Sequence, residues 1–211
     1  MKDLKHIKTL GLLAIAVLAL AAAFGTASAS AAPKWTASAA GLTLKTTTLE
    51  SHVFTVTGSN TTCKKTEFAG KTEGTETTVQ SVVPSYSECT AFGLPATVSV
   101  TNCKLTLTAD GISHLVKTDT AAGAPACAIH IEASSVFGKC KVTITEQTNE
   151  FTILYTPGPG RIHIILHDVK VSDHVTESTG VCPLTVGTHT NASYTGKSEV
   201  QAEGGTIGWD A

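Results

Sequence analysis

The chain has 211 residues, of which 42% are hydrophobic and 15% charged, and its formal net charge is −2. This balance offers no basic patch of the kind that attracts nucleic acid or an anionic membrane surface, so neither is expected as a partner. A chain of this length is long enough to bury a sizeable core in one domain.

The amino terminus has the pattern of a secretory signal peptide. Three lysines in the first eight residues precede an apolar run over residues 10–24, and Ala27-Ser28-Ala29 follows as an A-x-A cleavage site. This order predicts a signal peptide over residues 1–29, although cleavage after Ala31 also fits the rule. A membrane anchor is the alternative, but a span needs about 20 apolar residues and this run is shorter.

Residues 30–211 are expected to form a single exported domain that is secreted or extracellular. This part carries 12 basic and 16 acidic residues, which gives a formal charge of −4. After cleavage of the signal peptide, no contact with a membrane is expected. It contains no Pro/Ser-rich hinge or charge block that would serve as a linker. Residues 30–40 are small and polar apart from Trp35, so they are expected to be a flexible lead-in.

Alternation of apolar and polar residues dominates the domain and predicts strands, because side chains on a strand point to opposite faces with a period of two. One motif occurs twice, as Cys103-Lys104-Leu105-Thr106-Leu107-Thr108 and, with similar residues, as Cys140-Lys141-Val142-Thr143-Ile144-Thr145. Each copy is expected to be a half-buried strand. In chain order, the other clear strands are expected at residues 53–57, 79–83, 96–100, 112–117, 127–132, 151–155, 161–171, 190–195, 199–202 and 206–209.

Three short segments are expected to turn the chain. Asp110-Gly111 is typical of a tight hairpin, and Pro157-Gly158-Pro159-Gly160 should join strands 151–155 and 161–171. The apolar phase slips by one residue between Val100 and Cys103, which predicts a bulge or a tight turn at Thr101-Asn102.

The predicted fold class is therefore all-β. About ten to twelve short strands separated by Gly, Pro and Asn turns favour an antiparallel β-sandwich or barrel. The 35 threonines fit this class, because β-branched side chains suit a pleated surface.

All six cysteines follow the signal peptide, and an even number in an exported chain predicts a disulfide framework. Zinc ligation is disfavoured because no pair is closer in sequence than Cys127 and Cys140. Pairing of neighbours along the chain is favoured, with Cys89–Cys103 or Cys127–Cys140 left as alternatives. The favoured pairs are Cys63 with Cys89, Cys103 with Cys127, and Cys140 with Cys182.

Candidates for chemistry are few. His163 and His167 would share one face of a strand but lie roughly 13 Å apart, too far for one metal ion. Asp173 and His174 could add ligands, so these four residues are the weak metal candidates, and neither a metal nor another cofactor is expected. The chain has no G-x-S-x-G elbow, no phosphate-binding glycine loop and no H-E-x-x-H motif, so no catalytic residue is assigned.

The leading hypothesis is a non-enzymatic binding or structural role at the cell surface or in the medium. The partner would be a cell-wall or extracellular polysaccharide, or an extracellular protein. The alternative is an extracellular hydrolase acting on polysaccharide, whose carboxylates or histidines meet only in the fold. Two carboxyl groups about 5–10 Å apart in a cleft would favour that alternative.

Six motifs are spread over roughly residues 50–209: Phe68-Ala69-Gly70, Pro84-Ser85-Tyr86-Ser87-Glu88-Cys89-Thr90-Ala91, Pro95-Ala96-Thr97-Val98, Asn102-Cys103, Cys140-Lys141-Val142-Thr143-Ile144 and Tyr194-Thr195-Gly196. This series resembles a family of exported proteins that occur as many paralogues in high-GC Gram-positive soil bacteria. That family has cysteine and turn positions in common but no assigned activity. The resemblance therefore implies an extracellular all-β architecture and implies no substrate.

Overall fold

The computed structural model describes residues 31–211, apart from the side chains of residues 148–151, and the predicted signal peptide lies outside the described part. The described chain contains strands and no helix, so it holds no helix long and apolar enough to cross a membrane. Its strands are β1 (Lys34–Ala37), β2 (Leu44–Val56), β3 (Ser59–Gly70), β4 (Glu76–Thr77), β5 (Val79–Ala91), β6 (Leu94–Thr101), β7 (Cys103–Thr108), β8 (Ile112–Lys117), β9 (Ala128–Ser135), β10 (Gly138–Thr145), β11 (Gln147–Gly158), β12 (Arg161–Ser178), β13 (Gly187–Ala202) and β14 (Ile207–Asp210).

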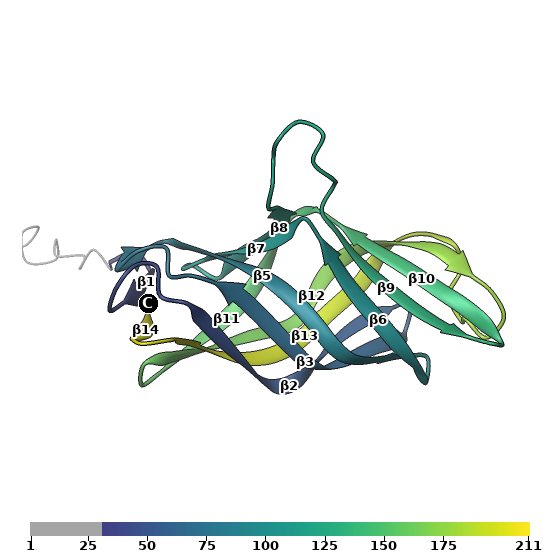
Figure 1. The fold of residues 1–211 in the computed structure, drawn as a ribbon, viewed down its shortest axis with the longest axis horizontal. Coiled ribbons are helices and arrows are strands. Elements are labelled where there is room, and N and C mark those ends of the chain that lie inside the picture. Colours follow the sequence, from purple (N-terminus) through teal and green to yellow (C-terminus); the bar gives the residue numbers. More distant parts are fainter. Residues whose placement is uncertain (1–30) are drawn as a thin grey trace, which may run out of the picture. The chain divides into compact units, whose positions relative to one another are not determined.

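The main sheet closes on itself, so the all-β prediction is confirmed and the architecture is a barrel (Figure 1). Its strand order is β10-β9-β6-β5-β3-β2-β13-β12-β11-β8-β7, and every pair is antiparallel. Two further pairings, β10–β12 and β5–β7, each complete a circuit of eight strands. The two circuits share β5, β3, β2, β13 and β12.

Closure depends on two long strands that change partner along their length. The first residues of β5, Val79–Val82, pair with β7, and its last residues, Cys89–Ala91, pair with β6. Likewise the first half of β12 pairs with β11 and its last residues pair with β10. Each end of the barrel therefore has its own set of three strands, and closure leaves fewer open edges than a sandwich would.

Threonine hydroxyl groups replace part of the backbone ladder between β2 and β3. The two strands pair directly only over His52–Val56 and Ser59–Cys63. Beyond that point the Thr46 hydroxyl accepts a hydrogen bond from the Phe68 amide at 3.0 Å, and the Thr48 hydroxyl accepts one from the Thr66 amide at 2.8 Å. Both hydroxyls also donate to the carbonyl of the same partner residue. The buried backbone groups of β3 are thereby satisfied although the strands have separated.

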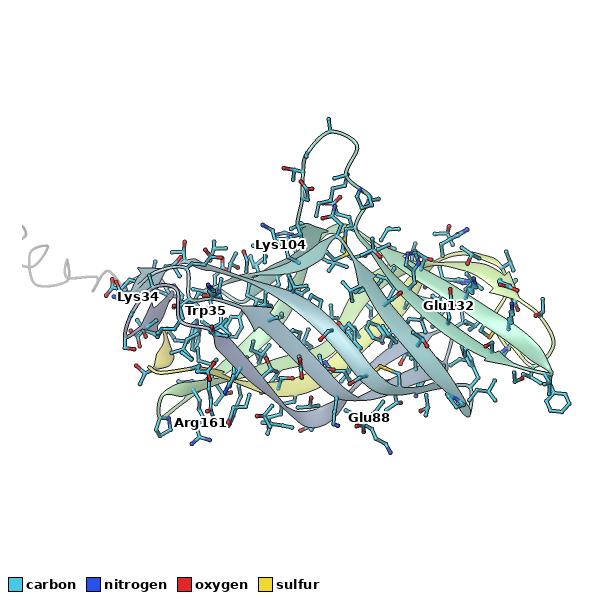
Figure 2. The ribbon with its side chains drawn as sticks, viewed as in Figure 1. Lys34, Trp35, Glu88, Lys104, Glu132 and Arg161 are labelled. Atoms are coloured by element: carbon cyan, nitrogen blue, oxygen red, sulfur yellow. A yellow bond between two sulfur atoms is a disulfide. The ribbon has the colours of Figure 1, made fainter. Side chains whose placement is uncertain are left out.

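A second, three-stranded sheet has the order β14-β1-β4, and it corrects the expectation of a flexible lead-in over residues 30–40. Residues 34–37 form β1, which pairs with β14 so that Trp35 lies opposite Trp209. Trp35, labelled in Figure 2, is buried, and its ring centroid lies 4.7 Å from that of Tyr155. Burial of a large aromatic surface stabilises this segment more than its small, polar neighbours indicate.

The three favoured disulfides are present, and the described chain has no free cysteine. Cys63 and Cys89 are direct partners on β3 and β5, so their bridge crosses adjacent strands. Cys103–Cys127 spans the loop between β8 and β9, which protrudes from the barrel in Figure 1. Asn102, at φ 49°, also holds that loop, because its side chain bonds the main chain of Asp119 and Pro125.

Candidate functional site

The four weak metal candidates do not come together. His163 bonds Glu199, His167 is exposed, and His174 bonds the Thr188 hydroxyl at 3.0 Å. Among the described residues, no group of three or more His, Cys, Asp or Glu side chains is arranged to hold a metal ion. The alternation of buried and outward side chains runs unbroken from Arg161 to His167, so His163 and His167 do share the outer face, and the register shift comes after it, between Leu166 and Val169.

Asp173 lies on β12 where that strand has passed from β11 to β10, and it is only 2% exposed. Neither of its carboxyl oxygens has a hydrogen-bond partner among the described residues. Burial raises the pKa of this carboxyl above its ordinary value, and the charges of His189 and His174 oppose the shift. The group is a cost to the fold whenever it is ionised, because a buried charge without a partner loses its hydration.

We therefore expect Asp173→Asn to stabilise the protein at pH 7 by on the order of 1 kcal/mol. The folded-state pKa is raised, so the native carboxyl holds its proton more tightly than the unfolded one and stability falls as the pH rises past about 4. The advantage of asparagine should accordingly shrink as the pH is lowered toward 3. Denaturant unfolding of both proteins across this range measures the difference.

Asp168→Asn is the matched control, because Asp168 is exposed on the same strand and bonds Lys170 at 2.8 Å. That bond lowers the pKa of the Asp168 carboxyl, so its loss should not stabilise the protein. If Asp173→Asn destabilises the protein at pH 7, or if both variants shift stability equally, the assignment of a costly buried carboxylate is wrong.

A second cluster lies on the outer face of the barrel, where four strands align polar side chains in rows. Partners in an antiparallel pair share a face, so the register places Thr156, His163, Glu199 and Thr47 in one row across β11, β12, β13 and β2. Arg161 and Gln201 are paired in the adjacent row. These six residues are called the outer polar patch. Its longer row crosses three gaps between strands, about 14 Å in all.

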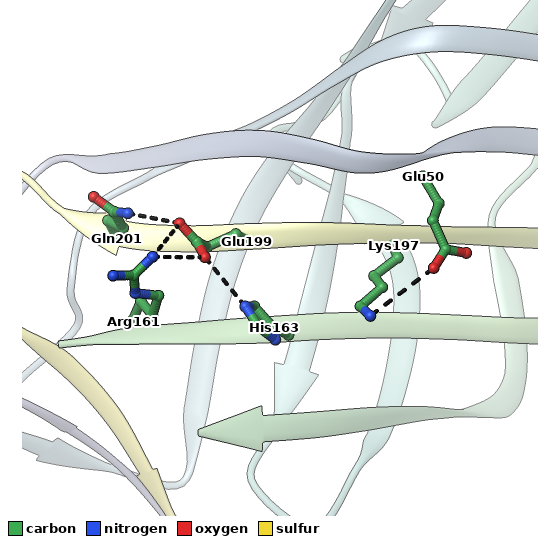
Figure 3. A network of polar contacts seen from close by, with 6 residues as sticks. All are labelled: Glu50, Arg161, His163, Lys197, Glu199 and Gln201. Carbon is green, nitrogen blue, oxygen red and sulfur yellow. Dashed lines mark hydrogen bonds and ion pairs between the residues drawn. The ribbon is translucent and has the colours of Figure 1, made fainter. Parts of the chain in front are cut away.

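Glu199 organises the patch (Figure 3). Its carboxylate accepts hydrogen bonds from Arg161 Nη1 at 3.1 and 3.3 Å, from Gln201 Nε2 at 2.6 Å and pairs with His163 Nε2 at 3.1 Å. The Arg161 guanidinium holds the pKa of this carboxyl below its ordinary value, with smaller contributions from Gln201 and His163. Glu199 is therefore a fixed anion that orients three neighbours, and it is unsuited to donate a proton as a general acid.

Charges in and around the patch nearly cancel. The Glu199 side chain is 11% exposed, whereas that of Arg161 is 43% exposed. Nearby, Lys197 pairs with Glu50 at 3.9 Å and Lys45 pairs with Glu203 at 2.8 Å. With the charges paired in this way, the patch offers a ligand mainly the N–H groups of Arg161 and Gln201 and the O–H groups of Thr47 and Thr156. Such a surface can form hydrogen bonds without attracting a strongly charged partner.

His52 is the centre of a network inside the barrel that sequence reasoning missed. It is 0% exposed, and its ring nitrogens lie 2.6 Å from the Tyr194 hydroxyl and 2.9 Å from the Ser198 hydroxyl. Tyr194 also donates to the Tyr86 hydroxyl at 3.1 Å. The Ser198 and His52 pair has the composition of a nucleophile and its base, but both side chains are fully buried and no substrate reaches them.

Two cavities that the described residues form near these clusters lack the lining of a catalytic cleft. The cavity inside the barrel has a volume of about 30 Å³, and its polar lining consists of Tyr86, Tyr194 and Gln147. A larger surface pocket of about 390 Å³, beside Gly158 and Gly208, has no ionisable lining residue. Neither contains two carboxylates, so neither supports the hydrolase alternative.

Comparisons with protein-family models, with curated proteins and with solved structures find no match to this chain. The function proposed below accordingly depends on the geometry of its own residues. Sequence reasoning had singled out His163 but not Glu199, Arg161 or Gln201. Alternation could have indicated that these side chains share faces of the sheet, because Glu199 and Gln201 are two residues apart on one expected strand and Arg161 and His163 are two apart on another.

Proposed function

We propose that this protein is an exported, non-enzymatic binding domain that uses the outer polar patch to bind a neutral, hydroxyl-rich extracellular polymer such as a cell-wall polysaccharide. A disulfide-rich all-β domain fits a stable extracellular fold, because bridges persist in oxidising compartments. The observation that supports the binding site is the row of polar side chains in register across four strands.

Three features of the patch favour a polysaccharide over a charged or apolar ligand. Its donors are held by Glu199 before any ligand arrives, which lowers the entropy lost on binding. Its charges are balanced, which suits a ligand that offers hydroxyl groups. It also follows the sheet without a deep pocket, as an extended polymer requires.

Tryptophan takes no part in this site. Trp35 and Trp209 are far apart in the sequence, yet both rings pack on Tyr155, at centroid distances of 4.7 and 5.7 Å. Trp35 is buried, and the Trp209 ring nitrogen donates to the Ala109 carbonyl at 2.7 Å. Binding on the patch would therefore depend on hydrogen bonds, with each charge-assisted bond contributing about 1.5–3 kcal/mol.

The test is depletion of the oxidised, signal-free protein from solution by three insoluble glycans: chitin, cellulose and peptidoglycan sacculi. We expect at least one of them to bind, and we expect Arg161→Ala to weaken that binding by about tenfold or more. Lys65→Ala is the control, because Lys65 forms its ion pair with Glu88 on β3 and β5, outside the patch. Absence of binding to all three glycans, or equal binding by the Arg161 variant, would contradict the proposal.

A further inference from the structure

The hairpin between β9 and β10 presents apolar side chains where a turn is normally polar. Val136 is 92% exposed and Phe137 is 72% exposed, at the turn of this hairpin. Val181, in the loop between β12 and β13, is 53% exposed, and its amide donates to the Phe137 carbonyl at 3.1 Å. These three residues are called the apolar tip. Figure 1 places the β9–β10 hairpin at the end of the barrel away from β1 and β14.

The two loops that carry the tip are fastened to each other. Lys139 and Thr179 exchange backbone hydrogen bonds of 3.2 and 2.9 Å. Cys140, the residue after Lys139, is joined to Cys182 by a disulfide, which also links the two loops. Gly138 and Gly180 allow the backbones to touch, since a Cβ on Gly180 would overlap the Phe137 carbonyl. The loops therefore cannot close over the apolar side chains, which remain presented to the surroundings.

The tip also differs in charge from the rest of the chain. Residues 133–140 and 178–188 contain one charged side chain between them, Lys139, whereas acidic residues outnumber basic ones in the whole chain. Lys139 forms no ion pair among the described residues; it follows Phe137 by two residues in the chain and borders a small surface pocket that Glu132 also lines. No carboxylate in these segments would have to lose its hydration if the tip entered an apolar phase.

We propose that the apolar tip inserts into the interfacial region of a phospholipid bilayer, with Lys139 at the level of the lipid phosphates. A convex tip of two loops would leave gaps against a flat protein surface, whereas lipid chains rearrange around it. Apolar side chains with an adjacent lysine are the combination that binds at the boundary between headgroups and acyl chains. This contact departs from the expectation, based on net charge, that no membrane partner binds. Overall acidity does not oppose it, because charges further than about one Debye length from the surface are screened.

Membrane contact through the tip is independent of the outer polar patch, which lies on β2, β11, β12 and β13. Only a few side chains would be buried, so the association is expected to be weak and reversible. A barrel attached in this way could present its outer face to polymer at the cell surface. Binding at either site can be lost without loss of the other, which makes the two proposals separable.

The experiment uses the oxidised, signal-free protein and phosphatidylcholine vesicles with or without phosphatidylglycerol. In a Phe137→Trp variant, we expect the new fluorescence to shift to shorter wavelength on vesicle addition and to be quenched by brominated lipid. In the chain without the reporter, Val136→Ser with Phe137→Ser should reduce the fraction that sediments with vesicles by about tenfold or more. Phosphatidylglycerol should strengthen binding of the native chain more than that of Lys139→Gln.

Leu154→Ser is the matched control, because Leu154 is also exposed but lies on β11, away from the tip. It should sediment with vesicles as the native chain does, and an unchanged unfolding midpoint in each variant excludes misfolding. The proposal is overturned if the native chain does not associate with either vesicle, or if the Val136/Phe137 variant and the Leu154 control bind equally. Association that depends on Lys139 but not on Val136 and Phe137 would also overturn it.

Discussion

Lowering the pH from 7 to 4 is expected to remove about 3 kcal/mol of folding stability through His52 alone. Burial lowers the pKa of the His52 ring from 6.5 to about 4, and the Lys197 main chain only partly offsets the shift. A depressed pKa means that the unfolded chain binds the proton more readily than the folded chain does. The contribution is complete above pH 6.5, declines as the pH falls through this window, and is lost at about pH 4.

Denaturant unfolding between pH 4 and 7 tests this expectation, with His52→Gln as the comparison because its side chain does not titrate. The native chain should lose about 3 kcal/mol more than the variant over this range. Ring nitrogen chemical shifts in an NMR titration would give the pKa of His52 directly. Equal pH dependence in the two proteins, or a ring that titrates near 6.5, would contradict the buried neutral imidazole.

A second large loss of folding stability is expected on substitution of Gly196, because the His52 ring packs directly against this glycine. A Cβ at this position would come within 2.7 Å of His52 Cε1 and closer still to two other ring atoms. The ring cannot move away easily, because both of its nitrogens are hydrogen-bonded and no part of it is exposed. Gly196→Ala should therefore destabilise the protein by about 1–3 kcal/mol, the range for overpacking a core.

A double-mutant cycle separates this contact from a general cost of alanine in a strand. In a His52→Ala background the added methyl group enters the space that the ring vacated, so Gly196→Ala should cost little there. The difference between the two backgrounds is the quantity to measure, by denaturant unfolding under non-reducing conditions. An equal penalty in both backgrounds would show that the His52 ring does not impose the glycine.

Local features of the fold could be predicted from the sequence because they depend on residues close together in the chain. The two copies of the Cys-Lys motif form β7 and β10, as predicted. The predicted turns at Asp110-Gly111 and Pro157–Gly160 join the strands on either side of them. The three favoured disulfides are present, but closeness in sequence does not select them, since Cys89–Cys103 and Cys127–Cys140 would be closer pairs. Strand register does, as where Cys63 lies opposite Cys89. Alternation also placed Arg161 and His163 on one face of their strand.

The candidate sites could be predicted only in part, because each combines strands that are distant in sequence. The outer polar patch needs the register of β12 against β13, which brings Arg161 to Glu199 across 38 residues. Val136 and Phe137 gave no signal of exposure, since an apolar pair next to a glycine fits a buried strand equally well. Both are exposed because they form the turn between the end of β9 at Ser135 and the start of β10 at Gly138.

The amino-acid sequence alone was enough to assign the all-β class and the local structure: alternating strands, tight turns, and cysteines that form bridges between neighbours along the chain. The folded structure was needed to show that the sheet closes, that Thr46 and Thr48 bridge two separated strands, and that His52 is enclosed beside Gly196. The physical reason is the range of each interaction. Periodicity and turn chemistry act over a few residues, whereas closure, burial and buried hydrogen bonds join segments that lie further apart, from 18 residues for Thr48 and Thr66 to 142 residues for His52 and Tyr194.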